Sequence, residues 1–564
     1  MGSRLAAFLL LVFVYLVNGN DDILEQKGRF MEAGMDPTVD PCEDFWSFAN
    51  ANLSSDVYDQ LISNNVLKAI AGRPGKRRGM VVEALRKEWD ACLYKTPEQY
   101  QRELALQLES DSLQRQEIED HIKRLSNKSY TTDNRIYITH LINIHRLLFK
   151  YGSDEFDENF VHLALFDEIA VGSGNPLFEF YKMGIIFGEE VDMRQVSAAA
   201  LNGYVKPEDR ISSMDLYIHR LNQTLRSPEP DCFSLVLRNY PMVLKKMLHD
   251  YYGQDYVDQA SSQFRDDLDT ISKTAETFIA NSNVLSDETK EKMLENLRNN
   301  TFYLIDHPIF EDGTFERFFG NVTFHKPAQN RNINNILPLI RAAAGKSPTF
   351  YFTADWVADN AYHAWHTHRS FFDWPVFVFP VYHPSYPTAL RFSGAGFIGA
   401  HELGHDFTKI EANGEFSELA DCLSEYYAHK CNPERPEICT DPKTSIGENF
   451  ADYFGIRMAY YAYKRAAAGH GVGRRPRGTI LDRLSDDQLF FVNFAQTTAN
   501  FNEWNQESAE KVHSPAPVRL LGALSGFRAF SNAFNCPAGS KFHRKEHCKL
   551  YDTDVKPNHN LTYN

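Results

Sequence analysis

The chain has 564 residues, of which 43% are hydrophobic, 13% aromatic and 24% charged. These values are typical of soluble globular proteins and exclude a disordered, collagenous or coiled-coil chain. The net charge of −16 opposes binding to phosphate backbones and anionic lipids, so we expect no nucleic-acid partner.

The first feature in the chain is a short apolar segment. Arg4 is followed by thirteen apolar residues, 5–17, and then by the polar sequence Asn18-Gly19-Asn20. A helix of that length spans about 20 Å, which is less than the bilayer core of about 30 Å. We therefore expect residues 1–19 to be a signal peptide, and we expect a secreted, extracellular protein without a membrane anchor.

Cysteines and glycosylation sequons also indicate the secretory pathway. The eight cysteines form an even number, which suits disulfide pairing in an oxidising compartment. Six sequons are possible glycan acceptors, at Asn52, Asn127, Asn222, Asn299, Asn321 and Asn560. We therefore expect a glycoprotein.

Helical periodicity dominates residues 80–300. Apolar residues from Phe264 to Phe278 recur at steps of three and four, which indicates one face of a helix. Ser286 is a good N-cap for the helix that follows. The pattern predicts a mainly helical N-terminal lobe over residues 20–345.

Composition changes after residue 345, and we expect a second domain over residues 346–564. Residues 376–379 predict a strand. Helices are expected near residues 416–429 and 448–468, and small residues at 393–400 should let the helix that follows them pack closely on neighbouring backbone.

His401-Glu402-Leu403-Gly404-His405 has the form H-E-x-x-H. Residues four apart on a helix lie one turn above each other, so both histidines can bind one zinc ion while Glu402 faces the attacking water. Gly404 inside that helix costs about 1 kcal/mol relative to alanine. The pattern is suggestive, and a catalytic zinc ion needs a third protein ligand.

Two glutamates compete for the third position. Glu425 lies twenty residues after His405. Glu448 is followed four residues later by Asp452, which can accept a hydrogen bond from a zinc-bound histidine and orient it. The presence of Asp452 favours Glu448 as the third zinc ligand. Ser445 and Glu448 also have the spacing of a helix capping box, which is the alternative interpretation of Glu448.

These residues together resemble the neprilysin-like zinc endopeptidases, which include the endothelin-converting enzymes. Further shared motifs are DPCEDFW at 40–46, SDETKEK at 286–292, Asn360-Ala361-Tyr362, GENFAD at 447–452, and His513-Ser514-Pro515 followed by Arg519. The resemblance implies a mainly α (α+β) fold with two lobes, one helical and one thermolysin-like, that enclose a central cavity.

The same resemblance implies one Zn²⁺ ion as cofactor. His401, His405 and Glu448 would bind it, Glu402 would be the catalytic base, and Asp452 would orient His401.

The resemblance also implies residues that act on the substrate. His513 would stabilise the oxyanion and Arg519 would hold a substrate carbonyl. Asn360 and Ala361 would bind the peptide main chain like an added strand. Ile398 would line the pocket for an apolar side chain.

Family pairing implies four disulfides: Cys42–Cys536, Cys92–Cys232, Cys422–Cys548 and Cys431–Cys439. A further family disulfide is absent, because both of its positions, near Asn50 and Ala499, lack cysteine.

The chain departs from the family after Tyr362. Here His363, His366 and His368 precede Phe379-Pro380, where the family continues quickly to a Phe-Pro strand. These histidines are either solvated loop residues or ligands of a second metal ion. The segment after Asp406 is also shorter than usual.

We therefore expect a zinc metalloendopeptidase, a gluzincin, that hydrolyses oligopeptides on the amino side of apolar residues and acts as a monomer. The alternative is a catalytically silent, secreted homologue that binds peptides without cutting them.

Overall fold

The computed structural model describes residues 22–53, 61, 68–69, 85, 89, 241–282, 285–310, 315, 361–364, 368–408, 417–428, 430–432, 439–440, 445–471, 473–498, 513–544 and 548. The expected signal peptide, Asn360 and the Cys92–Cys232 pair lie outside these residues. The fold is mainly helical with a few short strands, as expected.

The chain divides into two compact units. One unit contains Met1–Ala69, Leu248–His307 and Val357–Asn564, and the other contains Ile70–Met247 and Pro308–Trp356. The first unit is thus assembled from three separate stretches of sequence, whereas the boundary expected at residue 345 divides the chain once. All described site residues belong to the first unit.

The first unit includes the long helix α14 (Gln254–Ala280) and the shorter helix α15 (Asp287–Asn299). Phe264, Leu268 and Ile271 are each 0% exposed, which confirms the predicted apolar face of α14. The Ser286 side chain accepts a hydrogen bond from the Thr289 backbone N–H and so caps α15, as predicted.

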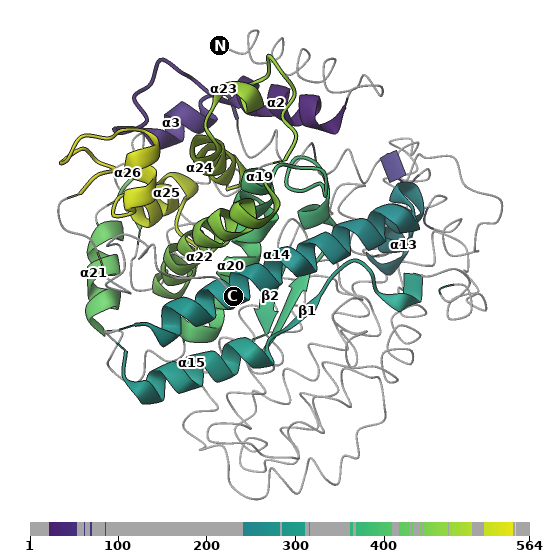
Figure 1. Cartoon of the computed structure of the whole chain (residues 1–564), viewed down its shortest axis with the longest axis horizontal. Coiled ribbons are helices and arrows are strands. Elements are labelled where there is room, and N and C mark those ends of the chain that lie inside the picture. The colour runs from purple at the N-terminus through teal and green to yellow at the C-terminus, as the bar shows by residue number, and fades with distance from the viewer. Residues whose placement is uncertain are drawn as a thin grey trace, which may run out of the picture. The chain divides into compact units, whose positions relative to one another are not determined.

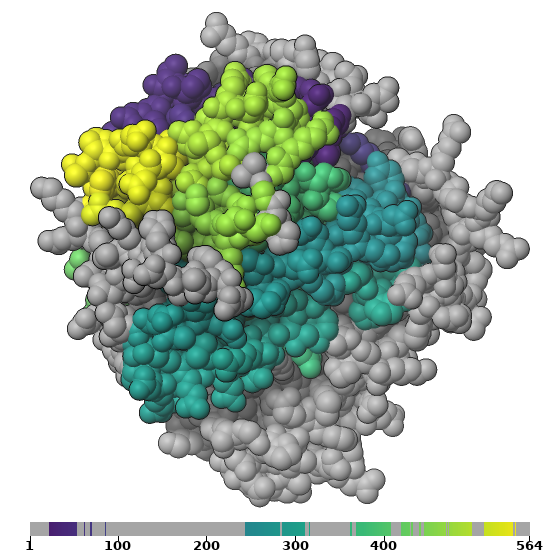
Figure 2. Space-filling model, in the orientation of Figure 1, coloured from purple at the N-terminus to yellow at the C-terminus, as the bar shows by residue number. Residues whose placement is uncertain are grey.

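Helices α20 (Ala395–Thr408) and α22 (Ile446–His470) pack side by side, and α14 packs against both (Figure 1). Figure 2 shows one face on which the residues of α14 adjoin those of α22. A Cβ atom on Gly404 would lie 3.0 Å from Ala451 Cα, and one on Gly455 would lie 2.9 Å from the backbone nitrogen of His401. The glycines therefore permit the close approach of α20 and α22.

The described strands form one small sheet in the order β1 (Thr301–Tyr303), β3 (Arg369–Phe372), β2 (Ala361–Ala364). Strand β3 runs parallel to β1 and antiparallel to β2, and His363 pairs with Ser370. Among the described strands, β2 lies at one edge of this sheet, and it packs against α20.

The strand predicted at residues 376–379 is wrong. The structure has a 3-10 helix, η5 (Trp374–Phe377), whose first backbone N–H donates to the Asp373 side chain. Its four residues are all buried, so the apolar run reflects burial on every side rather than a strand.

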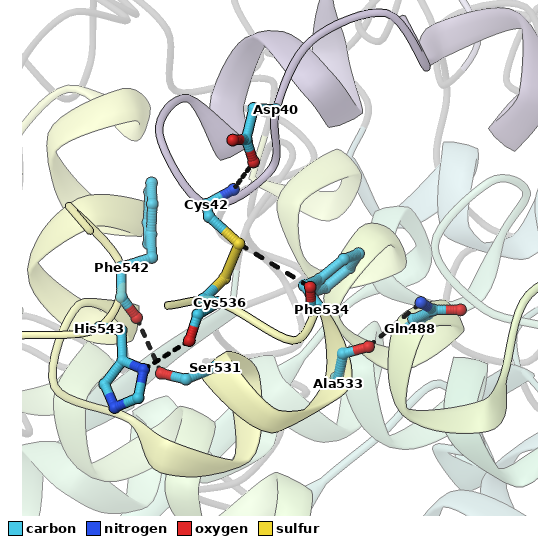
Figure 3. The surroundings of a disulfide bond; sticks show 9 residues. All are labelled: Asp40, Cys42, Gln488, Ser531, Ala533, Phe534, Cys536, Phe542 and His543. Carbon is cyan, nitrogen blue, oxygen red and sulfur yellow. Dashed lines mark hydrogen bonds between the residues drawn. A yellow bond between two sulfur atoms is a disulfide. The ribbon is translucent and has the colours of Figure 1, made fainter. Parts of the chain in front are cut away.

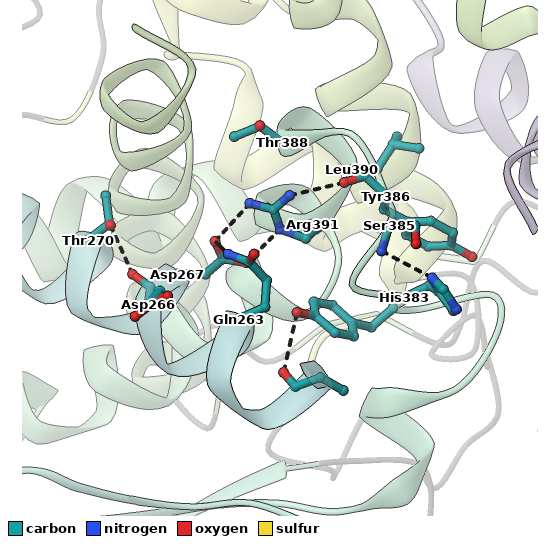
Figure 4. Close-up of polar contacts among 12 residues, drawn as sticks. Gln263, Asp266, Asp267, Thr270, His383, Ser385, Tyr386, Thr388, Leu390 and Arg391 are labelled. Carbon is teal, nitrogen blue, oxygen red and sulfur yellow. Dashed lines mark hydrogen bonds and ion pairs between the residues drawn. The ribbon is translucent and has the colours of Figure 1, made fainter. Parts of the chain in front are cut away.

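A partly buried ion pair joins α14 to α19 (Thr388–Ser393), as Figure 4 shows. Arg391 Nε donates to Asp267 Oδ2 over 2.9 Å, and Nη2 donates to Oδ1 over 3.1 Å. Arg391 Nη1 also donates to the Tyr386 carbonyl, so one guanidinium fixes the chain that leads into α20.

Other helices complete the described part of the chain. They are α2 (Ile23–Gly34), α3 (Phe45–Asn50), α13 (Pro241–Tyr252), α21 (Ser417–Tyr427), α23 (Ile480–Arg483), α24 (Asp486–Thr497), α25 (Ala516–Leu524), α26 (Arg528–Ala533) and the 3-10 helix η1 (Pro308–Phe310). The predicted helices near 416–429 and 448–468 are confirmed. Within the described residues, no helix has the length and apolar character that a membrane span requires.

Three of the four expected disulfides are confirmed: Cys42–Cys536, Cys422–Cys548 and Cys431–Cys439. The first one joins the N-terminal segment to the region after α26 (Figure 3). Near the position of the missing family disulfide, Asn50 Nδ2 donates to the Ala495 carbonyl over 3.0 Å. This hydrogen bond connects α3 to α24.

Candidate active site

The H-E-x-x-H residues lie on α20, as predicted. His401 and His405 are one turn apart, and their Nε2 atoms lie 3.1 Å from each other. Both imidazoles therefore present a nitrogen atom to one point beside the helix.

Glu448, in the first turn of α22, faces that same point. Its Oε2 atom lies 3.2 Å from His401 Nε2 and 3.6 Å from His405 Nε2. Ligand atoms bound tetrahedrally at about 2.0 to 2.1 Å from zinc are about 3.3 Å from one another. The three separations match this value.

The carboxylate also has the environment of a metal ligand. Glu448 Oε2 is buried and has no hydrogen bond of ordinary geometry, although three imidazole nitrogens surround it. A buried carboxylate oxygen without such a bond is costly unless a cation balances it. The residues present therefore fit a zinc ion.

The alternatives for Glu448 find no support in the geometry. Glu425 is exposed on α21. Ser445 stands at the N-cap of α22 but makes no side-chain hydrogen bond there, so the capping box that the sequence allowed is not formed.

Asp452, one turn further along α22, connects to His401. Its Oδ1 atom lies 2.9 Å from His401 Nδ1. Burial opposes ionisation of this carboxyl, but the charge and hydrogen bonds of Arg519 lower its pKa to about 2. An ionised Asp452 holds the Nδ1 proton of His401 and leaves Nε2 directed at the metal position.

His513 approaches Glu448 from the segment before α25. Its Nε2 atom lies 3.0 Å from Glu448 Oε2, and its side chain is 32% exposed. His401, Glu448 and His513 also form a set whose ligand atoms lie within 4.8 Å of one another. Two possible ligand sets thus share His401 and Glu448, and they differ in whether His405 or His513 completes them.

Glu402 lies between His401 and His405 in sequence and is 3% exposed. Burial raises the pKa of its carboxyl to about 7. A carboxyl group that titrates near neutrality is suited to accept and return a proton.

The expected substrate residues that the structure describes lie on α20 itself or on elements that pack against α20 or α22. Ala361 begins the edge strand β2 and is buried, while Ile398 is half-buried on α20, three residues before His401. Arg519 is buried against Asp452. Asn360 lies outside the described residues.

The sequence did not reveal the role of Asp406, which directly follows His405. Its Oδ1 atom lies 2.9 Å from His363 Nε2 and 2.8 Å from His368 Nδ1. The solvated-loop interpretation of His363 is wrong, because its side chain is 0% exposed. One signal was available: an acidic residue in the last turn of a helix opposes the helix dipole and needs donors nearby.

Comparison with known proteins relates part of the chain to a peptidase family. Residues 360–550 match the model of Peptidase family M13. The chain is 29% identical to Neprilysin-2 of Caenorhabditis elegans over 219 residues. This aligned segment covers 35% of this chain and 29% of that protein. It is 30% identical over 211 residues to Membrane metallo-endopeptidase-like 1 of Homo sapiens, which covers 34% of this chain and 27% of that protein.

The chain thus spans less than a third of each of these two relatives. A solved structure titled Haemonchus galactose containing glycoprotein complex has a TM-score of 0.60 with this chain at 15% identity. That likeness covers 94% of this chain and 100% of the other, and it shows a shared fold.

Proposed function

We propose that the chain, whose residues 360–550 match Peptidase family M13 and which is similar to neprilysin-like proteins, is a zinc metalloendopeptidase of the gluzincin type that hydrolyses oligopeptides. One observation carries the proposal: His401, His405 and Glu448 present three ligand atoms at separations of 3.1, 3.2 and 3.6 Å. These residues would hold one zinc ion. When bound, zinc supplies a Lewis acid that polarises the scissile carbonyl and makes the attacking water more acidic.

Of the two ligand sets, the one with His405 is favoured. His401 and His405 come from one rigid helix turn, and tetrahedral spacing is met by all three of its separations. His513 then remains available to donate a hydrogen bond to the developing oxyanion.

Proton transfer is assigned to Glu402. Its carboxylate accepts a proton from the attacking water and donates it to the leaving amine. Asp452 and Arg519 act behind His401 and keep its ring oriented. The contact of Arg519 with a substrate carbonyl stays a prediction.

The substrate is proposed to bind along β2. An edge strand offers backbone N–H and C=O groups to an extended peptide, and β2 has this position beside the zinc-binding helix. Ala361 and Asn360 would form the main-chain contacts. Ile398 would favour an apolar side chain after the scissile bond, which gives cleavage on the amino side of apolar residues.

We also propose that the protein is secreted and monomeric. The three disulfides in the described residues suit an oxidising compartment.

The test is incubation of the purified protein with a mixed peptide library in zinc buffer, with and without a chelator. New fragments that the chelator suppresses support an endopeptidase. Peptide retention without chelator-sensitive fragments supports instead the catalytically silent binding protein.

A further inference from the structure

One carboxylate connects the three strands of the sheet to the zinc-binding helix. Asp406, near the end of α20, contacts His363 of β2 through Oδ1. The same oxygen contacts His368, the residue directly before β3. Asp406 Oδ2 accepts from Nδ2 of Asn300, the residue directly before β1, over 2.9 Å.

These contacts close into a ring of side chains. His363 Nδ1 lies 2.9 Å from Ser370 Oγ, and Ser370 Oγ donates to Asn300 Oδ1 over 3.2 Å. Asn300 then donates to Asp406, which contacts His363. The side chains of Asp406 and His363 are 1% and 0% exposed. The contact of His363 Nε2 with Asp406 lacks the geometry of an ordinary hydrogen bond, so it is a close charged contact, and its loss leaves Nε2 buried without a nearby carboxylate.

The Asp406 carboxylate does not stabilise α20. A negative charge in the last turn of α20 opposes the helix dipole. A buried carboxylate is costly without partners, and Asp406 is contacted by His363, His368 and Asn300. Its partners, which lie in β2 or directly before β1 and β3, account for its position.

The ring of side chains connects β2 to α20, which backbone pairing between the strands does not do. Backbone hydrogen bonds fix β2 against β3 but leave the distance between β2 and α20 to side chains. A peptide paired with β2 would carry its scissile carbonyl toward His401 and His405 on α20. A misplacement of about 1 Å at a reacting atom can reduce a rate by a factor of about 100.

We propose that Asp406, acting through His363, is a positioning residue that sets the peptide-binding edge strand relative to the zinc-binding helix. The inference rests on the proposed function, because it takes β2 as the peptide-binding edge. His368 and Asn300 hold the other two strands to the same carboxylate.

Two substitutions at one position separate this role from general stability. In His363→Gln the amide can place a donor near the position of imidazole Nε2 and keep the contact with Asp406. In His363→Asn the shorter amide can reach only the position of Nδ1, so it keeps the contact with Ser370 and loses Asp406. Both variants replace an imidazole with a neutral amide, so each controls for the other.

Binding is measured in a Glu402→Gln background, where turnover does not interfere. The probe is a fluorescent heptapeptide with an apolar central residue, and anisotropy gives its Kd. We expect His363→Asn to raise Kd about tenfold and His363→Gln to raise it by less than about threefold. Zinc content and thermal midpoint should be equal in the two variants.

Turnover gives a second measurement with Glu402 intact. His363→Asn should lower kcat/KM about tenfold for the heptapeptide, and by less than about threefold for an N-acylated dipeptide amide, which makes fewer contacts along β2. His363→Gln should restore most of the loss for the heptapeptide.

Equal Kd values for the two variants, or equal losses of kcat/KM with long and short substrates, overturn the positioning role. These outcomes differ from failure of the proposed function, which is absence of chelator-sensitive cleavage by the unsubstituted protein. If that protein binds but does not cleave, the Kd comparison still decides the positioning role. If the parent with Glu402→Gln binds no peptide, the positioning role is rejected as well.

Discussion

Arg519 and Asp452 form a buried bidentate ion pair: Nε lies 2.6 Å from Oδ2, and Nη2 lies 2.6 Å from Oδ1. Asp452 Oδ1 also contacts His401 Nδ1. The pair therefore connects α25 to α20 through α22 and holds one imidazole of the candidate zinc centre in a fixed orientation.

Asp452→Asn should weaken zinc binding. The amide cannot hold both Arg519 and His401 as the carboxylate does, and a buried guanidinium loses its counter-charge. We expect the zinc affinity to fall by a factor of about 10 to 100, measured by competition with a fluorescent chelator. Asp269→Asn is the control, because Asp269 lies in an exposed pair with Lys273, and its affinity should not change. Unchanged affinity in Asp452→Asn contradicts the orienting role.

Glu402→Gln should retain zinc and lose peptide cleavage. Glutamine has the shape of glutamate but cannot accept a proton from water at neutral pH. Metal analysis together with a discontinuous peptide assay checks both halves of the statement. Cleavage by Glu402→Gln at the parental rate contradicts the assignment of the base.

Gly455→Ala should push α22 away from α20. The added Cβ atom would lie 2.9 Å from the His401 nitrogen and 3.0 Å from His401 Cα. Because both atoms are backbone, the helices must separate, and we expect a loss of about 1 to 3 kcal/mol in unfolding free energy, with lower zinc occupancy. Chemical denaturation and metal analysis measure these effects.

The matched control is Gly469→Ala in the same helix, where a Cβ atom meets nothing within 4 Å. Alanine there should stabilise the helix by about 0.5 to 1 kcal/mol. Equal effects of the two substitutions contradict the close-packing argument.

Lys27 should make stability depend on pH. Its ammonium is buried beneath Phe30 and Tyr386 and donates to the Pro380 carbonyl. Burial lowers its pKa from 10.5 to about 7. Between these two values the unfolded chain binds the proton that the folded chain has released, so the unfolding free energy contributed by Lys27 rises with pH.

The measurement is the unfolding free energy of the parent and of Lys27→Met between pH 7 and 10. The parent curve should rise more steeply than that of the variant, by up to about 1.4 kcal/mol per pH unit. Lys273→Met, at an exposed lysine, should run parallel to the parent. Parallel curves for the parent and Lys27→Met contradict the effect of burial.

Local signals predicted the helices well. The apolar face of α14 and the Ser286 cap of α15 depend on neighbours three or four residues away, which a sequence shows directly. The prediction of a strand at residues 376–379 was wrong because this apolar run is buried on all sides. Such a run has no hydrophobic periodicity by which a strand can be told from a compact turn.

The candidate site was predictable only in part. The H-E-x-x-H spacing and Asp452 four residues after Glu448 follow from helix geometry, whereas the choice between Glu448 and Glu425 depends on which helix faces α20. The ring around Asp406 joins residues from 300 to 406 in the sequence. Such a ring forms only when strand register and helix packing are both set, so no local pattern reveals it.

The most direct test of the account is the zinc content of the folded, purified protein, measured by plasma mass spectrometry beside Glu448→Gln. The account predicts one zinc ion per chain in the parent, and loss of most of this zinc from the variant under the same dialysis. A parent that holds no stoichiometric transition metal after resupply, or a variant that holds zinc as tightly as the parent, contradicts it.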